Sequence, residues 1–332
     1  MDSKLIQEGT YGCVVSPPLP CASSATQEKA QQTRTVGKII RKKNSINELK
    51  ISTLVKSIPG YARYYIIQEK DECSTKDFSE LRNKYQQQCK VYRQSPSDQL
   101  VQLVSPYAGA TVRSLGITDS FDFIGSLRHV LEGVCKLEEQ GICHFDLHNG
   151  NVLVDFKGTF RFIDFGSAFL GDLVDEKVVM KHVYEFSPDF PPQPPEMSVQ
   201  NGIHQGLTIA ESITRTMKQK RELSMAHKLL GLSVITQEAE LRNFWEDDTT
   251  WKGDEWTPFF KQYWRKWDSW AVGVLFLHIL QKCFLHQGFI MNTWAKNHAV
   301  LRTVLKGLLN AEPNGRFGAI DALNVLNYEL QK

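Results

Sequence analysis

The sequence predicts an α+β protein in which a small β-rich region precedes a larger, mainly helical region. Up to about residue 105, short apolar runs rich in Val and Ile alternate with turn residues, as strands do. Beyond that point apolar residues recur at helical spacing, most clearly in Asp119–Gln140. The stretch His144–Gly166 places acidic residues on either side of an apolar strand-turn-strand. A chain of 332 residues is long enough for one large domain or for two lobes with a sizeable core.

Composition excludes several classes of protein. A formal net charge of +2 gives no reason to expect a nucleic-acid partner or a membrane surface. The seven cysteines form no CxxC pair and no zinc-like spacing, which predicts reduced thiols in an intracellular compartment. The first residues, MDSKLIQEGTYG, contain no apolar core of a signal peptide. The longest apolar run, Trp270–Leu280, is too short to cross a bilayer and predicts a buried helix. We therefore expect a soluble cytoplasmic protein.

The first strands carry a glycine turn and a lysine. Leu5–Val15 predicts strand, turn and strand, with Gly9 and Gly12 in the turn. Glycines let a backbone approach phosphate oxygens closely, but a purely structural hairpin is favoured when these glycines are taken alone. Residues 16–35 predict a long loop, rich in proline, serine and glutamine. The following run, TVGKII, predicts a strand in which the charge of Lys38 needs a nearby anion.

Helices and further strands follow. Asn44–Ser57 predicts a helix that places Glu48 as the candidate partner of Lys38, with a solvated surface glutamate as the alternative. Its predicted apolar face consists of Ile46, Leu49, Leu54 and Val55. Strands are predicted at Tyr64–Gln68 and Gln99–Ser105, with a polar insertion at 70–98 that contains a helix over Phe78–Cys89. In the helix Asp119–Gln140 we expect Asp119 or Ser120 to be the cap and Gly141 to end the helix. The apolar stripe of that helix comprises Ile124, Leu127, Leu131, Val134 and Leu137.

The stretch HFDLHNGNVLVDFKGTFRFIDFG carries the candidate chemistry. Asp146 and Asp164 flank the strand-turn-strand, and Asn151 follows the first carboxylate by five residues. Oxygen ligands of this kind suit Mg²⁺, and a loop carboxylate beside the metal can accept a proton from a hydroxyl. The alternative is a hairpin with solvated acids at its ends.

This stretch resembles the catalytic and metal-binding loops of the protein kinases, HxDxxxxN followed by DFG. Other segments resemble kinase elements in the family's order over nearly the whole chain. EGTYGCVV is similar to the second half of the glycine-rich loop, although Gln7 stands where the first glycine belongs, and VQLVSPYAG is similar to the hinge. PPE resembles the end of the activation segment, WDSWAVG the DxWxxG helix and EPNGR the DPxxR turn, which matches Glu196, Asp268, Trp270, Gly273 and Arg316 to family positions.

The resemblance implies a two-lobed protein-kinase-like fold with an N-lobe at 1–105 and a C-lobe at 106–332. It also implies ATP and Mg²⁺ as cofactors and Ser/Thr hydroxyls of protein substrates as acceptors. Asp146 would accept the proton of the hydroxyl, and Asn151 and Asp164 would hold Mg²⁺. Lys38, kept in place by Glu48, would bind the α- and β-phosphates. Gly9, Gly12 and Val14 would cover the nucleotide. Arg316 would be the buried partner of Glu196.

Three departures from the family pattern leave alternatives open. His148 takes the place of the usual lysine after the catalytic aspartate and has a ring N–H that can bond the γ-phosphate. HxDLHxxN is also similar to small-molecule kinases of the aminoglycoside and choline type, and a catalytically silent scaffold is a further alternative. Phe145 replaces the arginine that pairs with an activating phosphate, so we expect no need for one. The insertion at about 197–266 predicts extra packing in preference to a docking surface. SPPLPC resembles kinases of large DNA viruses, which would place the protein in host cytoplasm or a virion.

Overall fold

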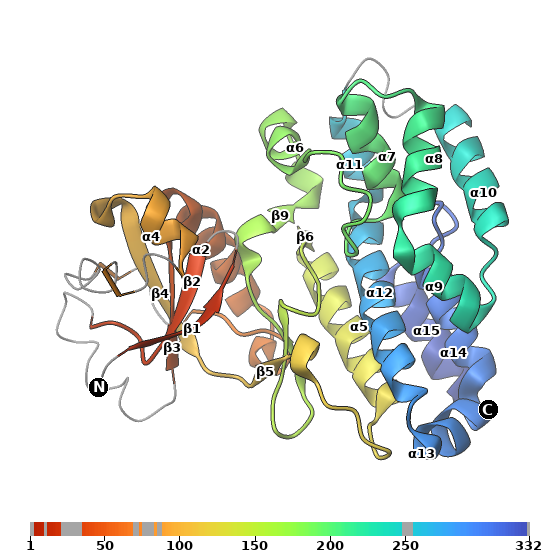
Figure 1. The fold of residues 1–332 in the computed structure, drawn as a ribbon, viewed down its shortest axis with the longest axis horizontal. Coiled ribbons are helices and arrows are strands. Elements are labelled where there is room, and N and C mark those ends of the chain that lie inside the picture. The colour runs from red at the N-terminus through yellow and green to blue at the C-terminus, as the bar shows by residue number, and fades with distance from the viewer. Residues whose placement is uncertain are drawn as a thin grey trace. The chain divides into compact units, whose positions relative to one another are not determined.

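The computed structural model of the protein describes residues 3–9, 12–20, 35–68, 73–74, 83–84, 88–247 and 255–330. The chain divides into two compact units, one formed by Met1–Gly109 with Arg161–Gly166 and the other by Ala110–Phe160 with Ser167–Lys332. An antiparallel sheet near the N-terminus is followed by a mainly helical region, so the α+β prediction is confirmed and the architecture fits a kinase-like fold (Figure 1).

The first unit is built on a four-stranded antiparallel sheet of order β1-β2-β3-β4. Its strands are β1 (Lys4–Glu8), β2 (Gly12–Ser16), β3 (Thr35–Arg41) and β4 (Leu100–Pro106). In the register, Lys38 of β3 lies opposite Val14 of β2 and Leu103 of β4, so the three side chains share one face of the sheet. The neighbouring residue Ile39 points to the other face.

That second face carries a buried disulfide. Cys13 and Cys89 are bonded, with Cα atoms 6.1 Å apart, and both are fully buried among apolar residues next to α4 (Lys90–Gln94). Cys73 is also disulfide-bonded, whereas Cys135, Cys143 and Cys283 are free and buried. The prediction of reduced thiols is therefore wrong for Cys13, Cys73 and Cys89. Sequence spacing alone could not show that the 70–98 insertion returns a cysteine to β2.

Helix α2 (Lys42–Lys56) confirms the predicted helix, but its predicted apolar face is only partly buried. Ile46 is 67% exposed, whereas Glu48, Ile51 and Val55 are buried. The predicted strand at Tyr64–Gln68 is wrong, because only a single bridge joins Tyr65 to Phe162 after the short helix η2 (Tyr61–Arg63). Residues 21–34 of the predicted loop and most of the predicted helix at Phe78–Cys89 lie outside the described residues.

The second unit begins with short strands around helix α5 (Phe123–Glu139). The predicted cap is wrong, since Asp122 accepts from the backbone N–H of Gly125 at 2.8 Å, but Gly141 follows the helix with a positive φ of 69°, as expected. Strand β5 (Ala110–Thr111) pairs with β7 (Val152–Val154), and β6 (Ile142–Cys143) pairs with β9 (Phe169–Leu170).

The remaining helices form the body of the second unit (Figure 1). Helix α12 (Trp267–Cys283) is buried on nearly every side and packs against α5, α9 and α14, as the apolar run predicts. No single helix of the described chain is long and apolar enough to cross a membrane; only a pair bent by 112°, Thr257–Cys283 with Gln287–Leu308, reaches that length and apolarity together. The other helices are α6 (Glu176–His182), α7 (Pro195–His204), α8 (Ile209–Gln219), α9 (Arg221–Leu230), α10 (Val234–Asp247), α11 (Thr257–Tyr263), α13 (Gln287–Phe289), α14 (Ala295–Leu308) and α15 (Ala319–Leu330).

Short helical turns and one strand complete the description: η3 (Ser97–Gln99), η4 (Val112–Ser114), β8 (Phe160–Phe162), η5 (Phe165–Ser167), η6 (Gly171–Leu173), η8 (Trp264–Lys266) and η9 (Ile290–Trp294). In the 197–266 segment, aromatic rings of α10 and α11 pack on one another. Trp245 lies 5.5 Å from Phe259, ring centre to ring centre, and Phe259 lies 5.2 Å from Tyr263, and all three are buried. This burial supports the packing interpretation of that segment.

Candidate functional site

A half-buried lysine and two carboxylates form the core of the site in the first unit. The ammonium group of Lys38 donates to Glu48 Oε2 at 2.7 Å and to Asp164 Oδ1 at 2.8 Å. Burial by itself would lower the pKa of Lys38, but the charges of Asp164 and Glu48 outweigh it and raise that pKa well above its usual range. Lys38 is therefore a permanent cation, and the predicted Lys38–Glu48 pair is confirmed.

Asp164 is held in an unusual backbone conformation. Its φ is 66°, a left-handed value that is uncommon outside glycine, and its Oδ1 also accepts from the backbone N–H of Gly166 at 3.2 Å. Asn47 of α2 donates to the carbonyl of Gly166 at 3.1 Å. Sequence reasoning missed Asn47, although its position beside Glu48 on the same helix is a signal that could have found it. The ring of Phe165 is buried and contacts Tyr65 edge-on.

In the second unit, Asp146 lies in the loop after β6 and its carboxylate has a neighbour at each oxygen. The amide nitrogen of Asn151 donates to Asp146 Oδ2 at 2.9 Å and to the Asp146 carbonyl at 3.0 Å. His148 Nε2 lies 3.6 Å from Asp146 Oδ1. The backbone N–H of Gly150 donates to His148 Nδ1 at 2.9 Å, so the ring proton belongs on Nε2, on the side of Asp146. The structure thus brings Asp146, His148 and Asn151 together.

The backbone just before Asp146 is held by hydrogen bonds to Asp268 of α12. The two Asp268 oxygens accept from the backbone N–H groups of His144, at 2.7 Å, and of Phe145, at 2.9 Å. Burial raises the pKa of Asp268 to about 6, although these N–H donors oppose the rise. The ring of Phe145 packs edge-on against His182 and Trp267, as expected of an apolar residue at this position. Asp268 therefore sets the direction of the loop.

Gly9 and Gly12 of the β1–β2 turn have a structural role. The N–H of Gly9 donates to the carbonyl of Gly12 at 2.8 Å across the β1–β2 turn, whose tip lies outside the described residues. A Cβ on Gly12 would meet the carbonyl of Ile39 and lie 2.6 Å from Cγ2 of Ile40. Gly12 is therefore required by the close approach of β3. Val14, the third residue predicted for this region, lies on the Lys38 face of the sheet.

The donor types fit Mg·ATP. Because the amide nitrogen of Asn151 is bound to Asp146, its oxygen is the atom suited to a cation, and Asp164 supplies a carboxylate. Among the described residues no three His, Cys, Asp or Glu side chains gather into a metal cluster. A site with few protein ligands is typical of Mg²⁺, which keeps waters and substrate phosphates in its coordination shell.

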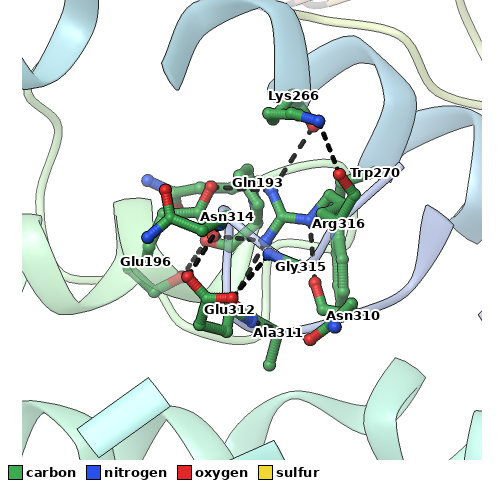
Figure 2. A network of polar contacts seen from close by, with 12 residues as sticks. Gln193, Glu196, Lys266, Trp270, Asn310, Ala311, Glu312, Asn314, Gly315 and Arg316 are labelled. Carbon is green, nitrogen blue, oxygen red and sulfur yellow. Dashed lines mark hydrogen bonds and ion pairs between the residues drawn. The ribbon is translucent and has the colours of Figure 1, made fainter. Parts of the chain in front are cut away.

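A buried ion pair joins Glu196 of α7 to Arg316 in the helical second unit (Figure 2). Arg316 Nη1 and Nη2 lie 2.7 Å and 2.6 Å from the two oxygens of Glu196, and both side chains have zero exposure. Arg316 also donates to the carbonyls of Asn310 and Ala311. Its guanidinium carbon lies 5.3 Å from the ring centre of Trp270. The predicted pairing of Glu196 with Arg316 is confirmed.

Comparison with known proteins finds a family that resembles part of the chain. Residues 103–195 match the model of the Phosphotransferase enzyme family (APH), which belongs to the protein-kinase-like superfamily. The matched segment includes Asp146, His148, Asn151 and Asp164 and ends one residue before Glu196. No curated protein matches the chain. The similarity supports a phosphotransferase enzyme of the kind that uses ATP.

Proposed function

We propose that this protein is a Mg²⁺-dependent kinase that transfers the γ-phosphate of ATP to Ser or Thr hydroxyls of protein substrates. The observation that carries the proposal is the ammonium of Lys38 placed between Glu48 and Asp164. Placing a half-buried lysine against two carboxylates gains little stability over apolar packing, so its presence favours a functional cation. The similarity of residues 103–195 to phosphotransferases supports the same reaction class.

The residues divide the chemistry between them. Lys38, oriented by Glu48, would neutralise phosphate charge. Asp164 and the Asn151 oxygen would hold Mg²⁺, and the metal would supply stabilisation of negative charge on the transferred group. Asp146 accepts the proton of the attacking hydroxyl. Asn151 orients one oxygen of Asp146 by a hydrogen bond, and His148 lies beside the other. The Nε2 atom of His148 lies 3.6 Å from Asp146 Oδ1, and its Nδ1 accepts from the backbone N–H of Gly150.

Features outside the matched segment favour a protein acceptor. The Glu196–Arg316 pair and the Asp268 anchor of the catalytic loop both correspond to motifs that resemble protein kinases. Within the matched segment, Tyr184 follows α6 by two residues and stacks on Phe145, and its 36% exposure gives a polypeptide acceptor an exposed ring beside the catalytic loop.

A small-molecule acceptor is the second candidate. The family model that matches residues 103–195 and the histidine at position 148 both favour it. A catalytically silent scaffold is disfavoured, since Lys38, Asp146, Asn151 and Asp164 are all retained.

The deciding experiment offers both acceptor classes at once. Purified protein is incubated with γ-labelled ATP and Mg²⁺, with casein and basic proteins in one series and with aminoglycosides and choline in another. Label in protein with none in the small molecules is expected, and the Asp146→Asn variant should transfer none. Label only in a small molecule would replace the proposal by the second candidate. No Mg·ATP binding by calorimetry would overturn both.

A further inference from the structure

The segment before α7 has an unusual need for side-chain donors. Phe190–Pro194 reads FPPQP, and its three prolines lack backbone N–H groups. Such a segment cannot be held by strand pairing, because it offers few donors and its carbonyls need partners from elsewhere. Phe190 is 42% exposed, whereas Pro192, Gln193 and Pro194 are buried, so burial fixes the end of the segment but not its exposed beginning at Phe190.

Lys220 supplies two of the missing donors. Its ammonium group donates to the carbonyls of Phe190 and Gln193, each at 2.8 Å. Trp270 of α12 donates to the carbonyl between them, that of Pro191, at 3.0 Å. Lys220 is 1% exposed and lies at the junction of α8 and α9, inside the 197–266 insertion. The insertion thus contributes a clip on the backbone of the FPPQP segment.

Burying the ammonium group of Lys220 has an energetic cost that packing alone does not explain. Burial lowers the pKa of Lys220 to about 8, although the carboxylates of Glu222, Glu196 and Asp189 partly oppose this. An apolar side chain of similar length would fill the same volume without desolvating a charge. The carbonyl bonds are what such a replacement would lose.

The clipped segment lies between two parts of the candidate site. Before it, the ring of Tyr184 stacks on Phe145, the residue that precedes Asp146, with centres 6.2 Å apart. After it, Glu196 is fixed by Arg316. The backbone of residues 190–194 therefore bridges the neighbourhood of the catalytic loop and a rigid anchor.

We propose that Lys220 is a positioning residue for the acceptor: by clipping the carbonyls of Phe190 and Gln193 it holds the surface on which the acceptor polypeptide lies. This inference rests on the proposed function. It gives the 197–266 insertion a role in acceptor binding that its packed aromatic core does not supply. Lys220 touches no reacting atom in this scheme and acts only through the segment.

The test compares Lys220→Met with Lys218→Met, a lysine of the same helix α8 that is exposed. Each variant is assayed for the acceptor KM with casein as the acceptor, for the ATP KM and for acceptor-independent ATP hydrolysis, and its melting temperature is recorded. We expect Lys220→Met to raise the acceptor KM about tenfold or more, with the two ATP parameters within about twofold of wild type. Lys218→Met should match wild type in all of them.

A second variant and a second readout keep the test decisive. Trp270→Phe removes the donor to Pro191 and should raise the acceptor KM in the same direction, so it decides the matter if Lys220→Met does not fold. Hydrogen exchange at the Phe190 amide should accelerate in Lys220→Met but not in Lys218→Met, whatever the activity. Unchanged acceptor KM and exchange, or parallel loss of acceptor and ATP parameters, would overturn the inference. Wild-type protein that binds no Mg·ATP would instead overturn the proposed function, and the exchange measurement would still test the clip.

Discussion

Breaking the Glu196–Arg316 pair is predicted to destabilise the helical body strongly. Both side chains have zero exposure and meet through two bonds of 2.7 Å and 2.6 Å. Arg316→Ala leaves a carboxylate buried without its partner, and Glu196→Ala leaves a buried guanidinium that retains only carbonyl acceptors. Each change should lower the free energy of unfolding by about 3–5 kcal/mol. That loss is a large part of the roughly 5–15 kcal/mol typical of a native protein.

The double variant separates a real contact from two independent losses. With both charges gone nothing remains uncompensated, so the double change should cost less than the sum of the single changes by at least about 2 kcal/mol. Unfolding in denaturant gives these energies. Thermal melting should fall by roughly 6–20 °C for each single variant.

The exposed pair Arg242–Glu238 provides the matched control. Its atoms lie 3.2 Å apart and its side chains are 37% and 39% exposed. Glu238→Ala should change stability by less than about 0.5 kcal/mol, since solvent screens such pairs. Strict additivity of Glu196→Ala and Arg316→Ala, or single effects as small as this control, would refute the reasoning.

Three further predictions follow from the site and the clip. Asp164→Ala should abolish transfer and weaken Mg·ATP binding, whereas Asp146→Asn should abolish transfer with nucleotide binding nearly intact; equal loss of binding in calorimetry would contradict the assigned roles. Phosphatase-treated protein and a Tyr184→Phe, Ser187→Ala variant should keep their activity, and inactivity with an intact fold and ATP binding would mean that an activating phosphate is needed after all. Because the folded-state pKa of Lys220 is lowered to about 8, the unfolded chain binds more protons between pH 8 and about 10.4. Stability of the wild type relative to Lys220→Met should therefore rise with pH across that window, by up to roughly 3 kcal/mol, and a flat or falling difference in denaturant midpoints would show that Lys220 does not titrate this way.

Residues within short motifs were predictable because their spacing is set by local geometry. Asp146 and Asn151 lie five residues apart in one loop, and their contact needs no knowledge of the rest of the chain. Glu196 and Arg316 are 120 residues apart, and only resemblance to a family pattern joined them in advance. The residues around Glu196 and Arg316 in the sequence do not show that these two side chains lie close together in the fold.

Other features of the fold depended on contacts between segments that are distant in the sequence. Asp119, Ser120 and Asp122 are all suitable caps for α5, but Asp119 Oδ1 accepts from the backbone N–H of Gly288 at 2.8 Å, which leaves Asp122 as the cap. The Cys13–Cys89 bond requires the 70–98 insertion to return to β2, and no spacing rule encodes that path. Lys220 sits in a segment without a motif, where an apolar periodicity predicts only a helix.

Two residues with strained backbone conformations are held in place by the polar groups and rings around them. In the described chain, positive φ outside glycine occurs at Phe145, which precedes the candidate carboxylate Asp146, and at Asp164, which is the other candidate carboxylate. Such conformations cost about 1–3 kcal/mol each and persist only where neighbours over-determine them. Phe145 is held by the Asp268 bond to its N–H and by rings on several sides, and Asp164 is held by Lys38 and Gly166. Asp268 is a buried charge and Lys38 a half-buried one, and packing alone would select neither. Asp268 and Lys38 therefore stabilise the strained backbone that positions Asp146 and Asp164, although their own burial lowers the stability of the fold. The proposed catalytic function explains this loss of stability, whereas a catalytically silent scaffold does not.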